Sequence, residues 1–348
     1  MSSDLPTNFQ VPFDPGFDPR SPVRSMIWVG VKNTLAAASV GITIAVVLGT
    51  LIGIARLSTN WLVAKLAMIY VEVFRNIPPL LIIIFFGSAV FTNGPFPLLS
   101  PTSEPTQLSV PGSDSTWLIL SNTVWGIPSF ASNGNTGAFW IAVLVALVVA
   151  IGLWRWRTKV NIETGQAHHR VLWSFGAFAA ITVAAFVALG TPYVWSFPAV
   201  AESGRRLEGG FVLNFGYISV TVALGLYTAS HIAEIIRGSI LAVDKGQSEA
   251  ANALALSGFQ RYRFVVLPQA MRIAIPPVIN QFLNLTKNTS LGTAVAYAEI
   301  TALTQSSIGN GRPAVPSLLV LIGIYLTFSF TISIVLNQVN KRFQVVGR

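Results

Sequence analysis

The sequence of 348 residues has no cysteine and few charged residues. The lack of cysteine excludes disulfides, thiolate metal sites and cysteine nucleophiles. Charged residues make up only 10% of the chain, whereas soluble domains carry roughly 25%. With 52% hydrophobic residues and a mean hydropathy of +0.63, the chain has too little charge to cover a surface that faces water. It is therefore predicted to be an all-α polytopic membrane protein.

Apolar stretches long enough to cross a bilayer, which takes about 20 residues, recur along the chain. About seven spans are expected, with eight possible, and tryptophans mark several of their ends, as is typical of the membrane–water interface. The expected spans are residues 31–55, 62–92, 137–154, 171–191, 211–236, 268–292 and 315–338. Residues 1–27 precede them as an N-terminal extramembrane segment.

The net charge of +9 comes from basic residues that lie between the spans and do not gather on one face, which disfavours nucleic acid as a partner. Cytoplasmic loops carry an excess of basic residues. If the N-terminus is periplasmic and the C-terminus cytoplasmic, thirteen basic residues fall in inside loops and seven in outside loops. In this orientation residues 93–136, which contain no Lys or Arg, form an external loop.

Two spans contain a proline pair, Pro78-Pro79 and Pro276-Pro277. Proline removes a backbone donor and clashes with the preceding turn, so each span is expected to be kinked or broken there. In transporters, paired interruptions point to the substrate site. An ordinary kink tolerated by neighbouring helices is the alternative. Arg75 is expected either to hold the broken helix or to contact a lipid headgroup or a partner.

The loop between the fifth and sixth spans, residues 244–268, is predicted to contain a short helix. Asp244 followed by Gln247 is a capping-box-like start, and Gly258 is expected to be the C-terminal cap. Small apolar groups recur at helical spacing and form a narrow face: Ala250, Ala251, Leu254 and Ala255. A helix of this kind, with no span to pack on, is typical of the peptide side of a helix-in-groove contact.

The same loop reads E-A-A from Glu249, has Ala255 four residues after Ala251, and ends in V-V-L-P at Pro268. It resembles the signature of permease subunits of bacterial ATP-binding-cassette importers: E-A-A, three residues, Gly, nine residues, Ile, any residue, Leu-Pro. Ala255 stands in place of the Gly and Val265 in place of the Ile. The resemblance implies a type I importer fold, with this loop as the coupling helix in a groove of a separate ATPase. The implied coupling residues are Glu249, Ala250, Ala251, Leu254, Ala255, Gly258 and Pro268.

Other segments resemble the polar amino-acid branch of this family. Y-V-E-V-F-R-N-I-P, ending at Pro78, is similar to its E-x-F-R-G/N-x-P segment, and I-A-E-I-I-R-G, from Ile232, is similar to A-E-I-x-R-G. N-Q-F at residues 280–282 and K-N-T-S-L at residues 287–291 also match. Residues 93–210 resemble the insertion of general L-amino-acid permease subunits, an external loop and two additional spans. The resemblance implies a type 1 transmembrane domain at residues 28–345 that pairs with a second homologous permease.

Charged and polar residues within the spans are the candidate substrate-binding residues. Lys287 is expected to attract the carboxylate of an amino acid and Glu234 its ammonium group. The alternatives are a structural ion pair between these two residues, or a lysine that extends to the interface. His231, one turn before Glu234, either tunes substrate choice or bonds to a neighbouring helix. Further donors and acceptors follow in the same stretch: Asn284, Asn288, Thr289 and Ser290.

The leading hypothesis is a non-enzymatic permease subunit of an ATP-driven L-amino-acid importer in the bacterial inner membrane. Its expected partners are an ATPase dimer that binds Mg-ATP, a second permease, a periplasmic amino-acid-binding protein and membrane lipids. The chain itself is expected to bind no cofactor or metal, since it lacks the phosphate loop G-x-x-x-x-G-K-S/T. A proton-coupled secondary transporter, with Glu234 and His231 as proton carriers, is the alternative, although it leaves the E-A-A loop unexplained. The sequence has no H-E-x-x-H or G-x-S-x-G motif, which disfavours an enzyme.

Overall fold

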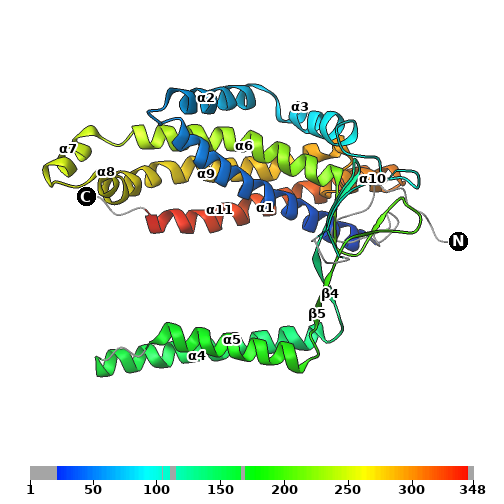
Figure 1. Cartoon of the computed structure of the whole chain (residues 1–348), viewed down its shortest axis with the longest axis horizontal. Helices are drawn as coiled ribbons and strands as arrows, with labels where there is room; N and C mark the ends of the chain where they lie inside the picture. The colour runs from blue at the N-terminus through cyan, green and yellow to red at the C-terminus, as the bar shows by residue number, and fades with distance from the viewer. Residues whose placement is uncertain (1–21, 104, 110–114, 166–168, 344–348) are drawn as a thin grey trace.

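The computed structural model describes residues 22–103, 105–109, 115–165 and 169–343. Most of the expected N-terminal segment, residues 1–21, and the last predicted cytoplasmic cation, Arg348, lie outside the described residues. The described chain consists of a helical bundle, a group of short strands at one end of it, and a helical hairpin that stands apart (Figure 1).

The helices of the bundle and the hairpin together include six of the expected spans. Five helices of the described chain are long and apolar enough to cross a membrane, and the bent pair Trp61–Asn76 and Pro79–Thr92 makes a sixth span. The expected span at residues 268–292 forms the helix Leu267–Asn288, which is more polar than the others and is not among the helices that meet this criterion of length and hydropathy. The helices of the bundle are α1 (Val23–Ala55), α2 (Trp61–Asn76), α3 (Pro79–Ile84), α6 (Phe215–Leu241), α9 (Leu267–Asn288), α10 (Ile300–Gly309) and α11 (Ala314–Phe343).

The bundle is built around the contact between α1 and α6. Small buried residues recur at every fourth position on both helices: Gly41, Ala45, Gly49 and Gly53 on α1, and Gly225, Ala229 and Ala233 on α6. A Cβ atom at Gly49 would lie 2.8 Å from the Ile232 side chain and 2.9 Å from the Ala229 carbonyl oxygen. Helices in lipid associate through such close van der Waals packing, because burial from lipid gives no hydrophobic gain.

The first proline pair bends the chain sharply. α2 ends at Asn76, Ile77 is extended with φ −96° and ψ 129°, and Pro79 is the first residue of α3. Proline suits this position, since its missing N–H would have no helical partner there. α2 and α3, with the π-helical continuation Phe85–Thr92, meet at 104°. The second pair, Pro276-Pro277, lies inside α9, which runs through both prolines without interruption.

Short strands form within the expected external loop, residues 93–136, and in residues 193–214, where the sequence analysis predicts no strands. Four of them form an antiparallel sheet in the order β1 (Thr106–Ser109), β2 (Thr116–Leu120), β3 (Val124–Ile127) and β8 (Phe211–Asn214). Two further pairs are β4 (Ser129–Ser132) with β5 (Tyr193–Ser196), and β6 (Ala199–Val200) with β7 (Leu207–Glu208). The strands are rich in β-branched and aromatic residues, which favour extended chain.

The hairpin of α4 (Thr136–Thr164) and α5 (Arg170–Ala188) extends from the pair β4–β5 and runs alongside the bundle at a distance (Figure 1). The two helices pack on each other. At their base the Trp140 indole N–H donates to the Tyr193 hydroxyl at 2.8 Å, which links α4 to β5. The predicted insertion, residues 93–210, thus comprises the strands β1 to β7 and this hairpin.

Replacement Gly49→Ala is expected to destabilise the protein, because the added methyl group overlaps Ile232 and the Ala229 carbonyl. Overpacking of this kind costs about 1–3 kcal/mol. The matched control is Gly152→Ala on α4, where no atom lies within 4 Å and the change is expected to be neutral or stabilising by at most about 1 kcal/mol. Thermal unfolding in detergent checks both variants, and equal melting temperatures would contradict the α1–α6 account.

Candidate functional site

The predicted coupling loop projects from the end of the bundle opposite the strands (Figure 1). It consists of α7 (Lys245–Ala253), α8 (Gly258–Arg261) and a π-helical segment, Tyr262–Val266, that leads into α9. Asp244 caps α7 as expected, accepting a hydrogen bond from the Gly246 N–H at 2.6 Å. The capping box is incomplete, because the Gln247 side chain accepts from the Gln269 amide at 3.0 Å. Gln247 thereby ties α7 to the start of α9.

The end of α7 differs from the prediction. Ala255 has a left-handed backbone with φ 57°, and the Leu256 N–H donates to the Ala251 carbonyl at 3.1 Å. Gly258 is not the C-terminal cap: it is the first residue of α8, whose start is fixed by a capping box between Ser257 and Gln260. Ala255 occupies the position of the Gly in the family signature, and glycine adopts this conformation without the penalty of a Cβ atom.

The loop exposes a set of large apolar side chains at this end of the bundle. Leu254 is 75% exposed, Phe259 71% and Phe264 62%, and we call these three residues the apolar loop patch. Phe259 and Phe264 escape prediction because they lie in α8 and the π-helical segment, outside the helical repeat of α7. Of the expected coupling residues, Glu249, Ala250 and Pro268 are exposed, whereas Ala251 is buried against its own loop.

A row of polar side chains runs along one face of α9. We call the exposed residues Arg272, Asn280, Asn284 and Lys287 the α9 polar stripe; Pro276 continues the same spacing of three or four residues. Among the described residues, these four side chains make no hydrogen bond or ion pair. Polar groups at membrane depth face water or a partner. Asn284 and Lys287 were predicted from the sequence and Arg272 and Asn280 were not, although the regular spacing of the four residues is a usable signal.

The other predicted residues at this end of α9 lie closer to the bundle. Thr289 is fully buried, and its hydroxyl donates to the Thr286 carbonyl at 2.8 Å. The Ser290 hydroxyl donates to the Lys287 carbonyl at 2.9 Å. Asn288 is half-buried at the last position of α9. The two hydroxyl protons are therefore used in backbone hydrogen bonds, which leaves Asn284 and Lys287 as the exposed polar groups of this cluster.

Glu234 lies in a cluster of charges near the end of α6. Its carboxylate accepts from Arg56, at the end of α1, and from the Arg237 guanidinium at 2.6 Å. Burial, and next the neighbouring Arg237, lower the pKa of Arg56. The two guanidinium groups therefore repel each other, and Glu234 compensates both. One turn earlier, the His231 ring packs edge-on against Tyr227 at 4.8 Å, and its Nε2 atom is buried without a hydrogen-bond partner among the described residues.

The structure does not bring Glu234 and Lys287 together. Leu285, two residues before Lys287, lies against Gly41 of α1, whereas Glu234 pairs with Arg56. Fifteen residues of helix separate these two points on α1, a distance of about 22 Å. The ammonium and carboxylate groups of an amino acid are attached to one carbon atom, so these two residues do not bind both ends of one molecule. The alternative of an ion pair between them is wrong for the same reason.

Comparison with known families agrees with this architecture. The sequence pattern of the family described as "Binding-protein-dependent transport system inner membrane component" matches residues 41–345. The chain belongs to this family. It is thus a multi-pass inner-membrane subunit of a transport system, and membership implies an ATPase partner and a substrate-binding protein.

Two relatives and two solved structures extend the comparison. The chain is 38% identical to the general L-amino acid transport system permease protein AapQ of Rhizobium johnstonii, over 95% of this chain and 80% of that protein. It is 33% identical to the glutamate/glutamine/aspartate/asparagine transport system permease protein BztB of Rhodobacter capsulatus, over 84% of this chain and 73% of that protein. A crystal structure of an amino acid ABC transporter with histidines matches with a TM-score of 0.53 at 16% identity, over 92% of this chain and 95% of that one. The inward-facing MetNI methionine transporter matches with a TM-score of 0.51 at 13% identity, over 93% of this chain and 99% of that one. These matches confirm the type I importer fold.

Replacement Ala255→Gly is expected to stabilise the coupling loop, because it removes the penalty of about 1–2 kcal/mol for a Cβ atom in the left-handed conformation. The matched control is Ala250→Gly within α7, which is expected to cost about 1 kcal/mol of helix stability. Hydrogen exchange of the amides in residues 245–256 measures both effects. Slower exchange in the first variant and faster exchange in the second are expected; the opposite order would contradict the left-handed cap.

Replacement Glu234→Gln is expected to lower stability by about 1–3 kcal/mol, because it leaves two neighbouring guanidinium groups without a counter-charge. Lys287→Met is the comparison: the lysine is exposed and has no partner within the described chain, so its loss is expected to leave unfolding unchanged. Melting temperatures of the isolated subunit in detergent distinguish the two. A stable Glu234→Gln variant would contradict the structural role of the Arg56–Glu234–Arg237 cluster.

Proposed function

We propose that this chain is a permease subunit of an ATP-driven importer of L-amino acids. The observation that carries the proposal is the coupling loop: a capped, helical segment beyond the membrane that exposes the apolar loop patch at one end of a transport fold. An exposed apolar surface of this kind is typical of a protein-binding site. In a family whose members belong to binding-protein-dependent systems, the fitting occupant is a groove of the ATPase subunit.

In this proposal the energy comes from the partner. The chain itself is proposed to hold no ATP, and Mg-ATP binds to an ATPase dimer that closes on binding ATP and moves α7 and α8. Because Gln247 bonds to Gln269 at the start of α9, movement of α7 reaches α9 directly. The spans are proposed to change shape at two points. One is the bend at Pro78-Pro79, next to Arg75, and the other is the pair Pro276-Pro277, beside the α9 polar stripe.

A second, homologous permease is proposed to cover the α9 polar stripe. The stripe carries two cations, Arg272 and Lys287, and no described acidic group pairs with either. Two identical stripes facing each other would bring like charges together, which favours a related partner that supplies acidic groups over a second copy of this chain. A heterodimer of permeases therefore fits the charge of this face.

The substrate is proposed to pass between the two permeases along the stripe. Lys287 attracts the carboxylate, and Asn280 and Asn284 supply amide donors and acceptors, as a polar zwitterion requires in an apolar wall. The ammonium group finds its partner on the second permease, since Glu234 lies far away. L-amino acids are the substrate class because the names of the relatives AapQ and BztB specify amino acids.

The proposed orientation has the coupling loop and the C-terminus in the cytoplasm and the N-terminus in the periplasm. The excess of basic residues in the corresponding loops supports it. The strands β1 to β8 then lie on the periplasmic side, where a substrate-binding protein delivers its load. Proton-coupled transport through Glu234 and His231 has no comparable support, because Glu234 is compensated by two arginines.

Replacements Leu254→Glu and Phe259→Glu are expected to reduce ATP-dependent amino-acid uptake by at least about tenfold, because they place charges in a desolvated contact. Leu98→Glu, an exposed apolar residue outside the coupling loop, is the matched control and is expected to retain uptake. Uptake and ATP hydrolysis are measured in liposomes that contain both permeases, the ATPase and the binding protein. Uptake that ignores ATP and is abolished by an uncoupler would overturn the proposal.

A further inference from the structure

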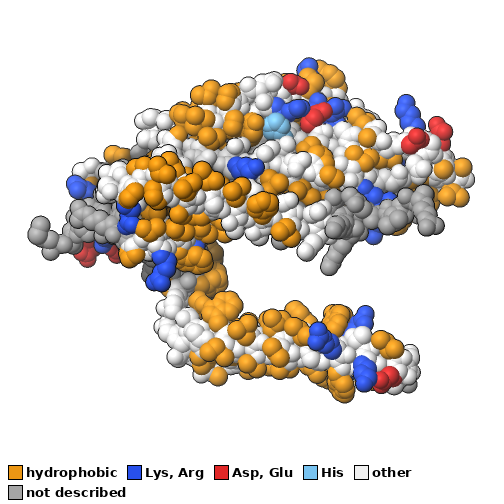
Figure 2. Space-filling view, turned by 180° about the vertical axis from the view of Figure 1, so that it is seen from behind, with side chains coloured by type: hydrophobic (Ala, Val, Ile, Leu, Met, Phe, Trp, Pro, Cys, Tyr) orange, Lys and Arg blue, Asp and Glu red, His pale blue; other side chains and the backbone are white. Residues whose placement is uncertain are grey.

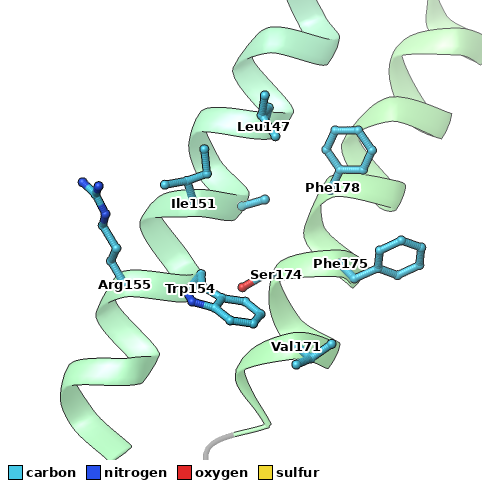
Figure 3. A pocket seen from close by; sticks show the side chains of 9 residues that line it. Leu147, Ile151, Trp154, Arg155, Val171, Ser174, Phe175 and Phe178 are labelled. Atoms are coloured by element: carbon cyan, nitrogen blue, oxygen red, sulfur yellow. The ribbon is translucent and has the colours of Figure 1, made fainter. Parts of the chain in front are cut away.

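The α4–α5 hairpin has little protein cover within the described chain. Only 11% of the membrane window of α4 and 6% of that of α5 are buried, against 67% for α6. Hydrophobic side chains cover the hairpin, and basic side chains gather at its free end (Figure 2). The two helices leave between them a groove in the half of the hairpin that lies near this basic end (Figure 3).

The groove has a volume of about 450 Å³, and its walls are almost entirely apolar. The side chains that line it include Leu147, Ala150, Ile151, Val171, Phe175 and Phe178. On its floor Ser174 is 6% exposed, and its hydroxyl has no hydrogen-bond partner among the described residues. This hydroxyl points toward α4 (Figure 3). The groove thus fits a hydrocarbon chain and offers one unsatisfied hydrogen-bond donor.

A second cavity, of about 470 Å³, adjoins the groove at Trp154 and Arg155 and follows α4 toward its end. Its walls include Arg155, Lys159 and Glu163. Four cations lie within this end of the hairpin, Arg155, Arg157, Lys159 and Arg170, and Glu163 is the one described carboxylate among them. Glu163 pairs with Lys159 at 3.8 Å. The cluster therefore retains a positive charge that this end of the described hairpin does not neutralise.

The depth of the two cavities follows from the length of α4. Its 29 residues extend about 43 Å, whereas the hydrocarbon core is about 30 Å thick. With Trp140 at one interface, the roughly 20 residues that cross the core place the other interface near Lys159, and the long side chain of Arg155, one turn earlier, extends to it. The aromatic residues support an interface at this end of the hairpin. The Arg170 guanidinium lies over the Trp154 ring, 5.2 Å from its centroid, and the Arg157 guanidinium lies over the Trp173 ring at 4.5 Å. Tryptophan is typical of this interface.

We propose that the α4–α5 groove binds one anionic phospholipid. An acyl chain lies along the apolar groove, the ester region lies near Ser174, and the phosphate lies in the second cavity against Arg155 and Lys159. The apolar cavity and the cationic cavity meet at the depth where the two parts of a phospholipid meet, and this match favours a lipid over a protein helix. The inference needs only membrane insertion of the hairpin and does not depend on the proposed substrate or energy source.

Native mass spectrometry of the protein, purified with its partner subunits, tests this site. The probes are phosphatidylglycerol and phosphatidylcholine with the same acyl chains. Retention of phosphatidylglycerol is expected to exceed that of phosphatidylcholine, and the double replacement Arg155→Gln with Lys159→Gln is expected to lower it about fivefold for each charge removed. The matched control is Arg205→Gln with Arg206→Gln, which removes the same charge near the strands and is expected to have no effect.

The acyl part of the site has its own variant. Ala150→Trp fills the groove without changing charge, and it is expected to reduce retention of phosphatidylglycerol while the hairpin keeps its helical content. Equal retention of the two lipids, or unchanged retention after loss of Arg155 and Lys159, would overturn the proposal. So would an Ala150→Trp variant that retains the lipid but releases a partner subunit, because a protein would then occupy the groove.

Discussion

Close packing of α1 on α6 through glycine and alanine is the contact on which the rest of the protein depends. At one end it brings Arg56 to Glu234, and at the other the Asn33 side chain donates to the Ala298 carbonyl at 2.7 Å while the Tyr297 hydroxyl donates to the Asn33 carbonyl at 2.7 Å. Polar contacts thus hold both ends of α1, one to α6 and the other to the segment before α10, while van der Waals packing on α6 holds its centre. α9 packs against α6, and this fixes which of its faces points away from the bundle.

Three of the surfaces that the described chain leaves uncovered differ in their chemistry. The apolar loop patch lies beyond the membrane and fits a protein groove. The α9 polar stripe lies at membrane depth, where uncovered amides and a lysine are stable only beside water or another polar surface. The α4–α5 hairpin is apolar along its length and basic at its end, which fits lipid. In the proposed function, import of amino acids uses the first two surfaces, and the hairpin is an addition outside the bundle.

Local sequence rules predicted much of this structure because the residues involved are neighbours in the chain. The Asp244 side chain accepts a hydrogen bond from a backbone N–H only two residues away, and Pro78-Pro79 bends the chain at the prolines themselves. A membrane span is recognised from about 20 consecutive residues. Contacts between distant residues escaped prediction. The partner of Glu234 is Arg56, 178 residues earlier, and no spacing rule identifies it. The strands also escaped, since pairs such as β4 with β5 join segments separated by the whole hairpin. Only half of the α9 polar stripe was predicted. The whole stripe follows from helical spacing, but only once α9 is known to be one continuous helix.

In the proposed function, the α9 polar stripe faces a water-filled path in the assembled importer. Single cysteines test it directly, because the chain has no cysteine to give a background. Asn280→Cys, Asn284→Cys and Lys287→Cys are compared with Val278→Cys and Phe282→Cys, which replace side chains packed on the bundle core. A charged thiol reagent is expected to label Asn280→Cys, Asn284→Cys and Lys287→Cys but not Val278→Cys or Phe282→Cys. Labelling of the three stripe positions is expected to change when ATP is added. Labelling that is equal at all five positions, or absent from the stripe, would contradict it.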